Sequence, residues 1–184
     1  MIKRNWKKIL IVLIVIAALV LVGIFLKKYN ASQSQLGAFT SPDGSFSTQL
    51  PKAWDAQITS KGAIVVTFVT DSIQSTSNVK PYINIAKGAF SGDLNTVYAE
   101  TTAKYQKLFR NIKVVDNGTV SIDGKEGKKF VFDGTLGGRV MRYAVIVTQE
   151  QGVIYTITSA AAPADFPQVQ PVLDSMASSW KFLQ

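Results

Sequence analysis

The chain has 184 residues, of which 47% are apolar and 17% are charged, so it holds enough apolar material to bury the core of one domain and to form an appendage. It contains no cysteine and no histidine, which excludes disulfides, Cys or His metal sites, thiol nucleophiles and Ser-His-Asp triads. A lipoprotein anchor, which requires a cysteine, is excluded as well.

The formal net charge of +8 is concentrated near the N-terminus. Residues 1–30 carry six basic residues and no acidic residue, whereas the remainder carries 14 basic and 12 acidic residues. Most of the chain is therefore close to neutral and lacks the basic surface that is typical of DNA or RNA binding. We expect no nucleic-acid partner.

The segment Ile9–Leu26 is apolar throughout and predicts a transmembrane helix in a lipid bilayer. Its 18 residues would extend about 27 Å as a helix, close to the hydrocarbon thickness. Four basic residues precede the segment and two follow it, which places the N-terminus in the cytoplasm and the rest of the chain outside.

A cleaved signal peptide has a similar charge pattern, but its apolar region is usually shorter. The segment is also followed by Lys27-Lys28-Tyr29-Asn30 rather than by a small-x-small cleavage site. We therefore favour an uncleaved, single-pass anchor in the cell membrane. The predicted parts are a cytoplasmic segment of residues 1–8, a spanning helix of residues 9–26, a polar tether of residues 27–38 and an extracytoplasmic domain of residues 39–184.

Several segments of the predicted domain alternate between apolar and polar residues with the period of a β-strand. Ala63–Val69 is instead a continuous apolar run, which predicts a strand covered on both faces. Gly137-Gly138 predicts a two-residue hairpin. The seven predicted strands are Phe46–Leu50, Ala63–Val69, Tyr82–Lys87, Thr119–Ile122, Lys128–Gly134, Arg139–Thr148 and Val153–Ser159. Because most connections are short, the sheet should be largely antiparallel.

Two segments have helical periodicity. Between Asp93 and Ile112 the apolar residues recur at three- and four-residue spacing, and Asp93 is a good N-cap. A second apolar stripe runs from Asp165 to Ser179, where we expect the regular helix to begin near Pro171 because proline disrupts a helix interior. Two helices around an antiparallel sheet of about six or seven strands predict an α+β sandwich.

Two local motifs stand near the start and the end of the predicted domain. The first motif is Phe39-Thr-Ser-Pro-Asp-Gly-Ser-Phe-Ser-Thr-Gln-Leu-Pro-Lys-Ala-Trp54, and the second is Gly152-Val-Ile-Tyr-Thr-Ile-Thr-Ser159 followed by a helix and Ser179-Trp-Lys-Phe182. These motifs and the order of the predicted elements resemble the PsbP-like domain family. The resemblance covers about residues 39–184 and implies a PsbP-like α-β-α sandwich, a fold group that includes DcrB-like proteins. Its motifs are structural and none is catalytic. Because the sequence predicts an N-terminal anchor and no chloroplast transit peptide, we take the resemblance to imply the fold and not a role in photosynthesis.

Five residues are candidates for a ligand or partner surface. Arg139, Arg142 and Tyr143 lie on one predicted strand, where Arg142 either pairs with a carboxylate such as Asp133 or lines a groove. Asp71 and Lys80 belong to the polar loop Thr70–Lys80, which is long for a compact domain and is expected to bind a partner without contributing to stability.

A basic edge on the first helix, formed by Lys104, Lys107, Arg110 and Lys113, could meet acidic lipid or a partner, although a solvated helix face explains it more simply. Ser178–Lys181 matches the S-x-x-K acylation motif, but it closes a predicted helix instead of opening one.

We expect an anchored binding or scaffolding protein with no catalytic activity, no cofactor and no metal, whose partner is a membrane or envelope protein. Two alternatives stay open: a DcrB-type carrier of a small molecule or lipid, and a hydrolase that works without His or Cys. A buried pocket near Arg142 would favour the carrier, whereas a filled sandwich with one exposed apolar patch would favour the scaffold.

Overall fold

The computed structural model describes residues 35–59 and 62–183. The predicted transmembrane segment Ile9–Leu26 lies outside these ranges, and within them no helix has the length and apolar character needed to cross a membrane. The strands are β1 (Leu36–Thr40), β2 (Phe46–Pro51), β3 (Trp54–Ile58), β4 (Ile64–Thr70), β5 (Tyr82–Ala89), β6 (Arg110–Ile122), β7 (Lys125–Leu136), β8 (Arg139–Glu150), β9 (Val153–Ala161) and β10 (Lys181–Phe182); the helices are α2 (Leu94–Leu108) and α3 (Phe166–Ser179).

Seven of these strands form one sheet in the order β3-β4-β5-β9-β8-β7-β6, and β1, β2 and β10 form a second, smaller sheet. Each pair of neighbours in the larger sheet is antiparallel, which confirms the predicted sheet type. Three strands, β1, β3 and β10, are not among the seven predicted. β1 begins at Leu36, within the segment that the sequence suggested as tether.

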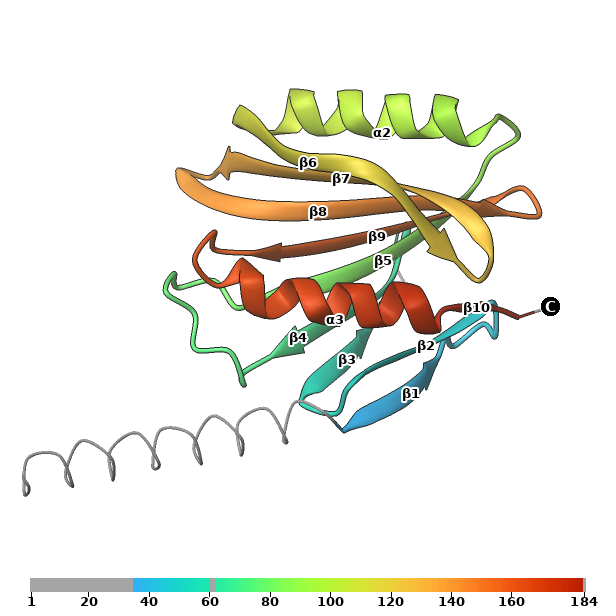
Figure 1. Ribbon diagram of the computed structural model, residues 1–184, viewed down its shortest axis with the longest axis horizontal. Helices are drawn as coiled ribbons and strands as arrows, with labels where there is room; N and C mark the ends of the chain where they lie inside the picture. The colour runs from blue at the N-terminus through green and yellow to red at the C-terminus, as the bar shows by residue number, and fades with distance from the viewer. Residues whose placement is uncertain (1–34, 60–61, 184) are drawn as a thin grey trace, which may run out of the picture. The chain divides into compact units, whose positions relative to one another are not determined.

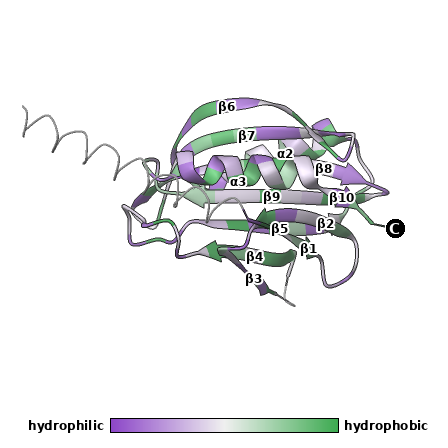
Figure 2. Ribbon diagram, turned by 60° about the horizontal axis from the view of Figure 1, so that its bottom comes forward, coloured by the Kyte–Doolittle hydropathy of each residue, from purple (hydrophilic) through white to green (hydrophobic). Residues whose placement is uncertain are grey.

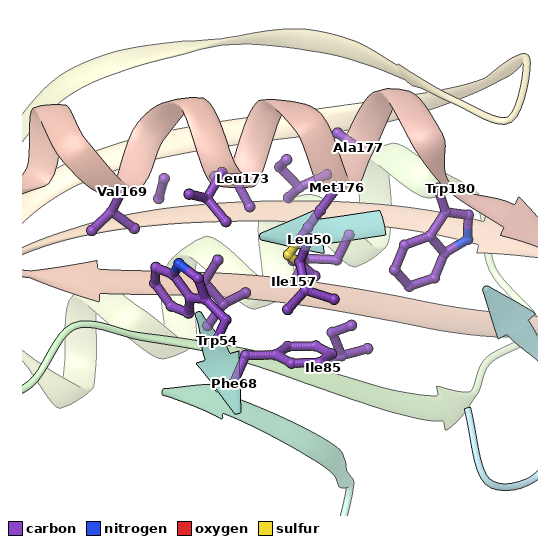
Figure 3. Close-up of a cluster of buried hydrophobic side chains, with 14 of the residues drawn as sticks. Leu50, Trp54, Phe68, Ile85, Ile157, Val169, Leu173, Met176, Ala177 and Trp180 are labelled. Carbon is purple, nitrogen blue, oxygen red and sulfur yellow. The ribbon is translucent and has the colours of Figure 1, made fainter. Parts of the chain in front are cut away.

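The large sheet lies between two helices (Figure 1). On one face, α3 packs against β2, β6 and β9 and buries an apolar cluster in which Trp54, Phe68, Leu173 and Trp180 are at most 5% exposed. Figure 3 shows these side chains meeting between the helix and the strands. On the other face, α2 packs on β6, β7 and β8 over a second cluster that contains Val97, Phe132 and Tyr143.

Helix α2 begins as predicted and ends earlier than predicted. The Asp93 carboxylate accepts hydrogen bonds from the backbone N–H groups of Asn95 at 2.8 Å and Thr96 at 3.0 Å, so it caps the helix. The helix stops at Leu108, because Phe109 turns to an extended conformation and Arg110 begins pairing with β7. The long antiparallel ladder between β6 and β7 therefore overrides the helical periodicity of the last four residues predicted as helix.

Helix α3 begins at Phe166, five residues before the predicted start at Pro171. Pro171 removes one internal hydrogen bond, which normally disfavours a helix interior. Here the helix continues through it because the apolar stripe on both sides is buried, including Phe166, Val169 and Leu173. Tertiary packing thus outweighs the local cost of the proline.

Strand β4 is covered on one face only, so the prediction that both faces are covered was wrong. Val66 and Phe68 are fully buried in the α3-side cluster, whereas Val65, Thr67 and Val69 on the other face are half-exposed. The strand is apolar along most of its length (Figure 2), because β-branched residues also suit a half-exposed pleated face. Helix α2 packs over β6, β7 and β8 and leaves this face of β4 open.

Candidate functional site

A hollow of about 310 Å³ lies at the end of the sheet where β7 turns into β8. Its lining includes Arg139 and Tyr143 from β8, together with Tyr82 at the start of β5. The other lining residues are Val79, Leu136, Gly137 and Met141. Two of the five predicted surface residues therefore share one hollow.

Arg142 lies on the opposite face of β8, which separates it from Arg139 and Tyr143. Its guanidinium donates to both carboxylate oxygens of Asp133, at 2.7 and 2.9 Å, and lies 6.0 Å from the centre of the Phe166 ring. The hydrogen bonds from Arg142 to Asp133 raise the pKa of the guanidinium above its ordinary value. The predicted pairing with Asp133 is thus confirmed, and the guanidinium is already occupied by this carboxylate.

Asp71 and Lys80 lie at the two ends of the β4–β5 loop and form an ion pair at 2.6 Å. Both side chains are highly exposed, at 79% and 67%, so the pair contributes little to stability. The structure brings these two predicted residues together with each other, but neither lines the hollow of Arg139 and Tyr143.

The loop itself is tied to the body of the domain, in contrast to the loosely held connector expected from its sequence. Ile73 is 3% exposed and belongs to the α3-side cluster. The buried carboxylate of Asp165, just before α3, accepts hydrogen bonds from the Ser75 hydroxyl at 3.1 Å and the Thr76 N–H at 2.9 Å. The sequence pattern did not predict these hydrogen bonds, because Asp165 lies 90 residues from Ser75 and 89 residues from Thr76 along the chain.

Three tyrosines gather beneath the C-terminal half of α2. Burial raises the pKa of Tyr82, Tyr105 and Tyr143, and the neighbouring phenols raise that of Tyr143 further. The hydroxyls of Tyr105 and Thr158 are hydrogen-bonded at 3.0 Å, which ties the helix to β9. Because their pKa values lie above 10, these phenols stay protonated at neutral pH and act as hydrogen-bonding groups rather than as bases.

A groove of about 420 Å³ lies between α2 and strands β5 and β9. Its strand side carries the small residues Ala86 and Gly88, and its helix side carries Thr101 and Leu108. The remaining lining residues are Ala63, Lys87, Ala89, Val97, Glu100, Lys104, Tyr105, Ile154 and Thr156. The small side chains of β5 leave room for another chain to approach the sheet closely.

The open face of β4 and β5 lies beside the groove, because Asn84 and Ala86 alternate onto the same face of β5. There the Thr67 hydroxyl donates to the Asn84 side-chain oxygen at 2.7 Å, and Val65 and Val69 are half-exposed on either side. Sequence reasoning did not identify this region. Its local signal is that three of the four residues from Ala86 to Ala89 are alanine or glycine.

The structure shows the surroundings of the S-x-x-K stretch and of the acidic side chains, which are the candidate ligands for a metal ion. The Ser178 hydroxyl donates to the Ser175 carbonyl at 3.0 Å, and Lys181 pairs with Asp123 at 2.6 Å, so both polar ends of the S-x-x-K stretch make structural contacts. Across the ranges that the structure describes, no three Asp or Glu side chains gather in a way that could hold a metal ion.

Comparison with solved structures gives the same fold at low sequence identity. CyanoP from Synechocystis sp. PCC 6803 matches with a TM-score of 0.59 at 14% identity, over 81% of this chain and 93% of that protein. LpqN from Mycobacterium tuberculosis, described as involved in cell envelope biogenesis, matches with a TM-score of 0.62 at 14% identity, over 82% and 91%. PA94 from Pseudomonas aeruginosa, described as a putative regulator of unknown function, gives 0.52 at 16%, over 76% and 92%.

Among curated proteins no sequence matches this chain. The model of the PsbP family matches residues 34–182, which include all of the strands and helices described above. The resemblance noted in the two sequence motifs is thereby confirmed. This chain belongs to the PsbP family.

Proposed function

We propose that this chain is a membrane-anchored, extracytoplasmic binding or scaffolding protein without catalytic activity. In this proposal the apolar segment Ile9–Leu26 anchors the chain, and the domain holds a segment of a membrane or envelope protein. The observation that carries the proposal is the groove beside α2, together with the neighbouring sheet face that α2 leaves uncovered.

The composition of this surface suits a polypeptide partner. Half-exposed valines and small residues offer apolar contact, whereas Asn84, Thr67, Glu100 and Lys104 offer hydrogen bonds and charge at its edges. This mixture of an apolar centre and a polar rim is typical of protein interfaces. The membership of LpqN in the same fold group, with its stated part in cell envelope biogenesis, supports an envelope partner.

The pairing of Arg142 favours a scaffold over a carrier. A carrier built around Arg142 would need its guanidinium free to meet a ligand, but both Asp133 oxygens occupy it. A carrier could use the groove instead, because about 420 Å³ lies within the range of small-molecule sites. Mass spectrometry of the chain purified from native membranes would then detect a bound small molecule.

Site-specific photo-crosslinking in native membranes tests the binding surface. A photoreactive residue at Thr101, which lines the groove, should give a discrete crosslinked protein. The same residue at Ala103, which is exposed on α2 and outside the groove lining, is the matched control and should not. Equal crosslinking from both positions would show that the groove is not the partner site.

Blocking the groove gives a second readout. A Thr101→Trp side chain would fill part of the groove and should abolish partner capture, whereas Ala103→Trp should leave it intact. Both substitutions place a tryptophan on the same helix, and the melting temperature of each variant shows whether it has disturbed folding. Capture that survives Thr101→Trp would place the partner elsewhere on the domain.

A further inference from the structure

Of the thirteen basic residues in the described ranges, seven form an ion pair with a carboxylate and six do not. Two of the six are Lys52 and Lys104. Among the described residues, the ion-paired ones are Lys80, Lys87, Lys125, Lys128, Lys129, Arg142 and Lys181. In the same part of the chain, Lys107, Arg110, Lys113 and Arg139 form no ion pair, and all four are exposed.

The strand register gathers these four residues at one end of the domain, where Lys113 on β6 lies opposite Asp133 of β7. Lys107 lies in the last turn of α2, and Arg110 begins β6 directly opposite Thr135 of β7. Thr135 in turn lies opposite Val140, next to Arg139 at the start of β8. Figure 1 shows the end of α2, the start of β6 and the β7–β8 hairpin at the same end of the sheet.

Exposed aliphatic side chains lie among these charges. Leu108 is 56% exposed, Leu136 is 46% exposed and Val140 is 54% exposed. We call the surface formed by Lys107, Leu108, Arg110, Lys113, Leu136, Arg139 and Val140 the basic end. A surface that combines unpaired cations with protruding aliphatic side chains suits the boundary between lipid headgroups and acyl chains.

The carboxylates at this end of the sheet are already engaged. Asp133 is held by Arg142, Asp71 is paired with Lys80, and the buried Asp165 accepts from Ser75 and Thr76. The basic end therefore carries about four uncompensated positive charges. This surplus is larger than the net charge of +2 that the sequence outside residues 1–30 carries as a whole.

The described domain also begins at this end. Gly37 lies against Lys52, which precedes β3, and Trp54 at the start of β3 pairs with Thr70 at the end of β4. The β4–β5 loop that follows Thr70 leads to Tyr82, in the hollow next to Arg139. The described domain therefore begins at the same strand ends as the basic end, but at the opposite edge of the sheet, because β3 and β6 are its two edge strands.

We propose that the basic end docks the domain on the anionic surface of the membrane that anchors it. This inference rests on the proposed anchoring, and it adds an orientation: the hairpin tip and the end of α2 face the lipid, and the groove beside α2 lies along the flank. An acidic protein would attract the same charges, but it would not explain why aliphatic side chains protrude among them at the end where the domain begins.

The absence of cysteine allows this orientation to be measured with single labels on the full-length chain. Gln106→Cys places a fluorophore beside the basic end, and Ser91→Cys places one before α2, at the other end of the helix. The chain is reconstituted into vesicles of phosphatidylcholine alone or mixed equally with phosphatidylglycerol. Nitroxide-labelled headgroups then report which label lies at the surface.

In vesicles with phosphatidylglycerol and about 50 mM salt, we expect strong quenching at Gln106→Cys and weak quenching at Ser91→Cys. Raising the salt to about 500 mM should abolish the difference, because it screens surface charge. Each removed charge should lower the equilibrium constant for docking about fivefold, so the double variant Lys107→Gln/Arg139→Gln should lower that constant roughly 25-fold. Lys125→Gln/Lys181→Gln removes the same charge near the β6–β7 turn and should change nothing.

Equal quenching of the two labels, or quenching that does not depend on phosphatidylglycerol, would overturn the docking. Resistance to carbonate extraction, measured on the same vesicles, tests the anchor separately. If the chain is extracted, the anchoring has failed, and docking is then judged by flotation: the basic end predicts flotation with phosphatidylglycerol vesicles that high salt and the Lys107→Gln/Arg139→Gln variant both prevent. Without such flotation the docking is wrong as well.

Discussion

Ile73 is the residue through which the β4–β5 loop should contribute most to stability. Its side chain is 3% exposed within the cluster beneath α3. Replacing a buried isoleucine by alanine removes its apolar contacts and leaves a cavity, which costs about 2–5 kcal/mol. For a domain of this size, each kcal/mol lowers the melting temperature by roughly 2–4 °C. We therefore expect Ile73→Ala to lower it by about 5–15 °C.

Thermal and urea unfolding, followed by circular dichroism and tryptophan fluorescence, measure this change. Ile58→Ala is the matched control, because it makes the same substitution at a side chain that is 53% exposed on β3. Its effect should stay within about 0.5 kcal/mol. If Ile73→Ala also costs less than about 1 kcal/mol, the loop is not held by the core.

The hydrogen bonds to Asp165 predict a second, independent effect in the same loop. Asp165→Ala would leave the Thr76 N–H without its acceptor, which costs about 1–3 kcal/mol for a buried group. Shortening the loop to a tight turn would remove both Ile73 and these hydrogen bonds. It should therefore destabilise the domain, contrary to the expectation from the sequence that the melting temperature would hardly change.

Three further predictions concern the core, the tyrosines and the anchor. Trp54→Ala should destabilise the domain by about 3–5 kcal/mol in urea unfolding, because its ring is 5% exposed in the α3-side cluster; a loss below about 1 kcal/mol would mean that the ring is not core. Burial raises the pKa of Tyr82, Tyr105 and Tyr143 above 10 in the folded state, so the unfolded chain releases these protons first and stability should fall as the pH rises past about 10. Absorbance at alkaline pH should show these tyrosines ionising together with unfolding, and their ionisation in the folded state near pH 10 would contradict the burial. A reporter fused after Gln184 should be active outside the cytoplasm and stay with membranes after carbonate washing, whereas release of a shortened product would disprove the anchor.

Local sequence patterns were sufficient to predict the pairing of β7 with β8, which are consecutive in the chain and neighbours in the sheet. The Gly137-Gly138 turn fixes the register of β7 and β8, so that Leu136 lies opposite Arg139 and Asp133 lies opposite Arg142. The ion pair between Asp133 and Arg142 follows from that register, because a two-residue hairpin leaves no freedom in the pairing. Asp93 identified the start of α2 for a similar reason, since a cap acts within three residues of the chain.

The alternation of side chains along a strand could have separated Arg139 from Arg142. Positions 139 and 142 differ by an odd number of residues, so their side chains point to opposite faces of β8. Arg142 therefore meets Asp133 on the α3 side, while Arg139 and Tyr143 line the hollow on the α2 side. Treating the two arginines as one surface grouped them by sequence distance, although alternation along the strand already assigned them to different environments.

The groove and the basic end depend on contacts that no local pattern contains. The groove exists because β9 pairs with β5, which brings Ile154 beside Gly88, and because α2 lies over β6, β7 and β8 instead of β3 and β4. The basic end exists because α2 stops at Leu108, so Arg110 leaves the helix and joins the sheet edge near the hairpin. Had the helix continued to Ile112 as predicted, Lys107 and Arg110 would form part of one solvated helix face. Because α2 ends at Leu108, Arg110 lies on a surface that it shares with Arg139. The positive charge is therefore concentrated at one end only in the folded domain.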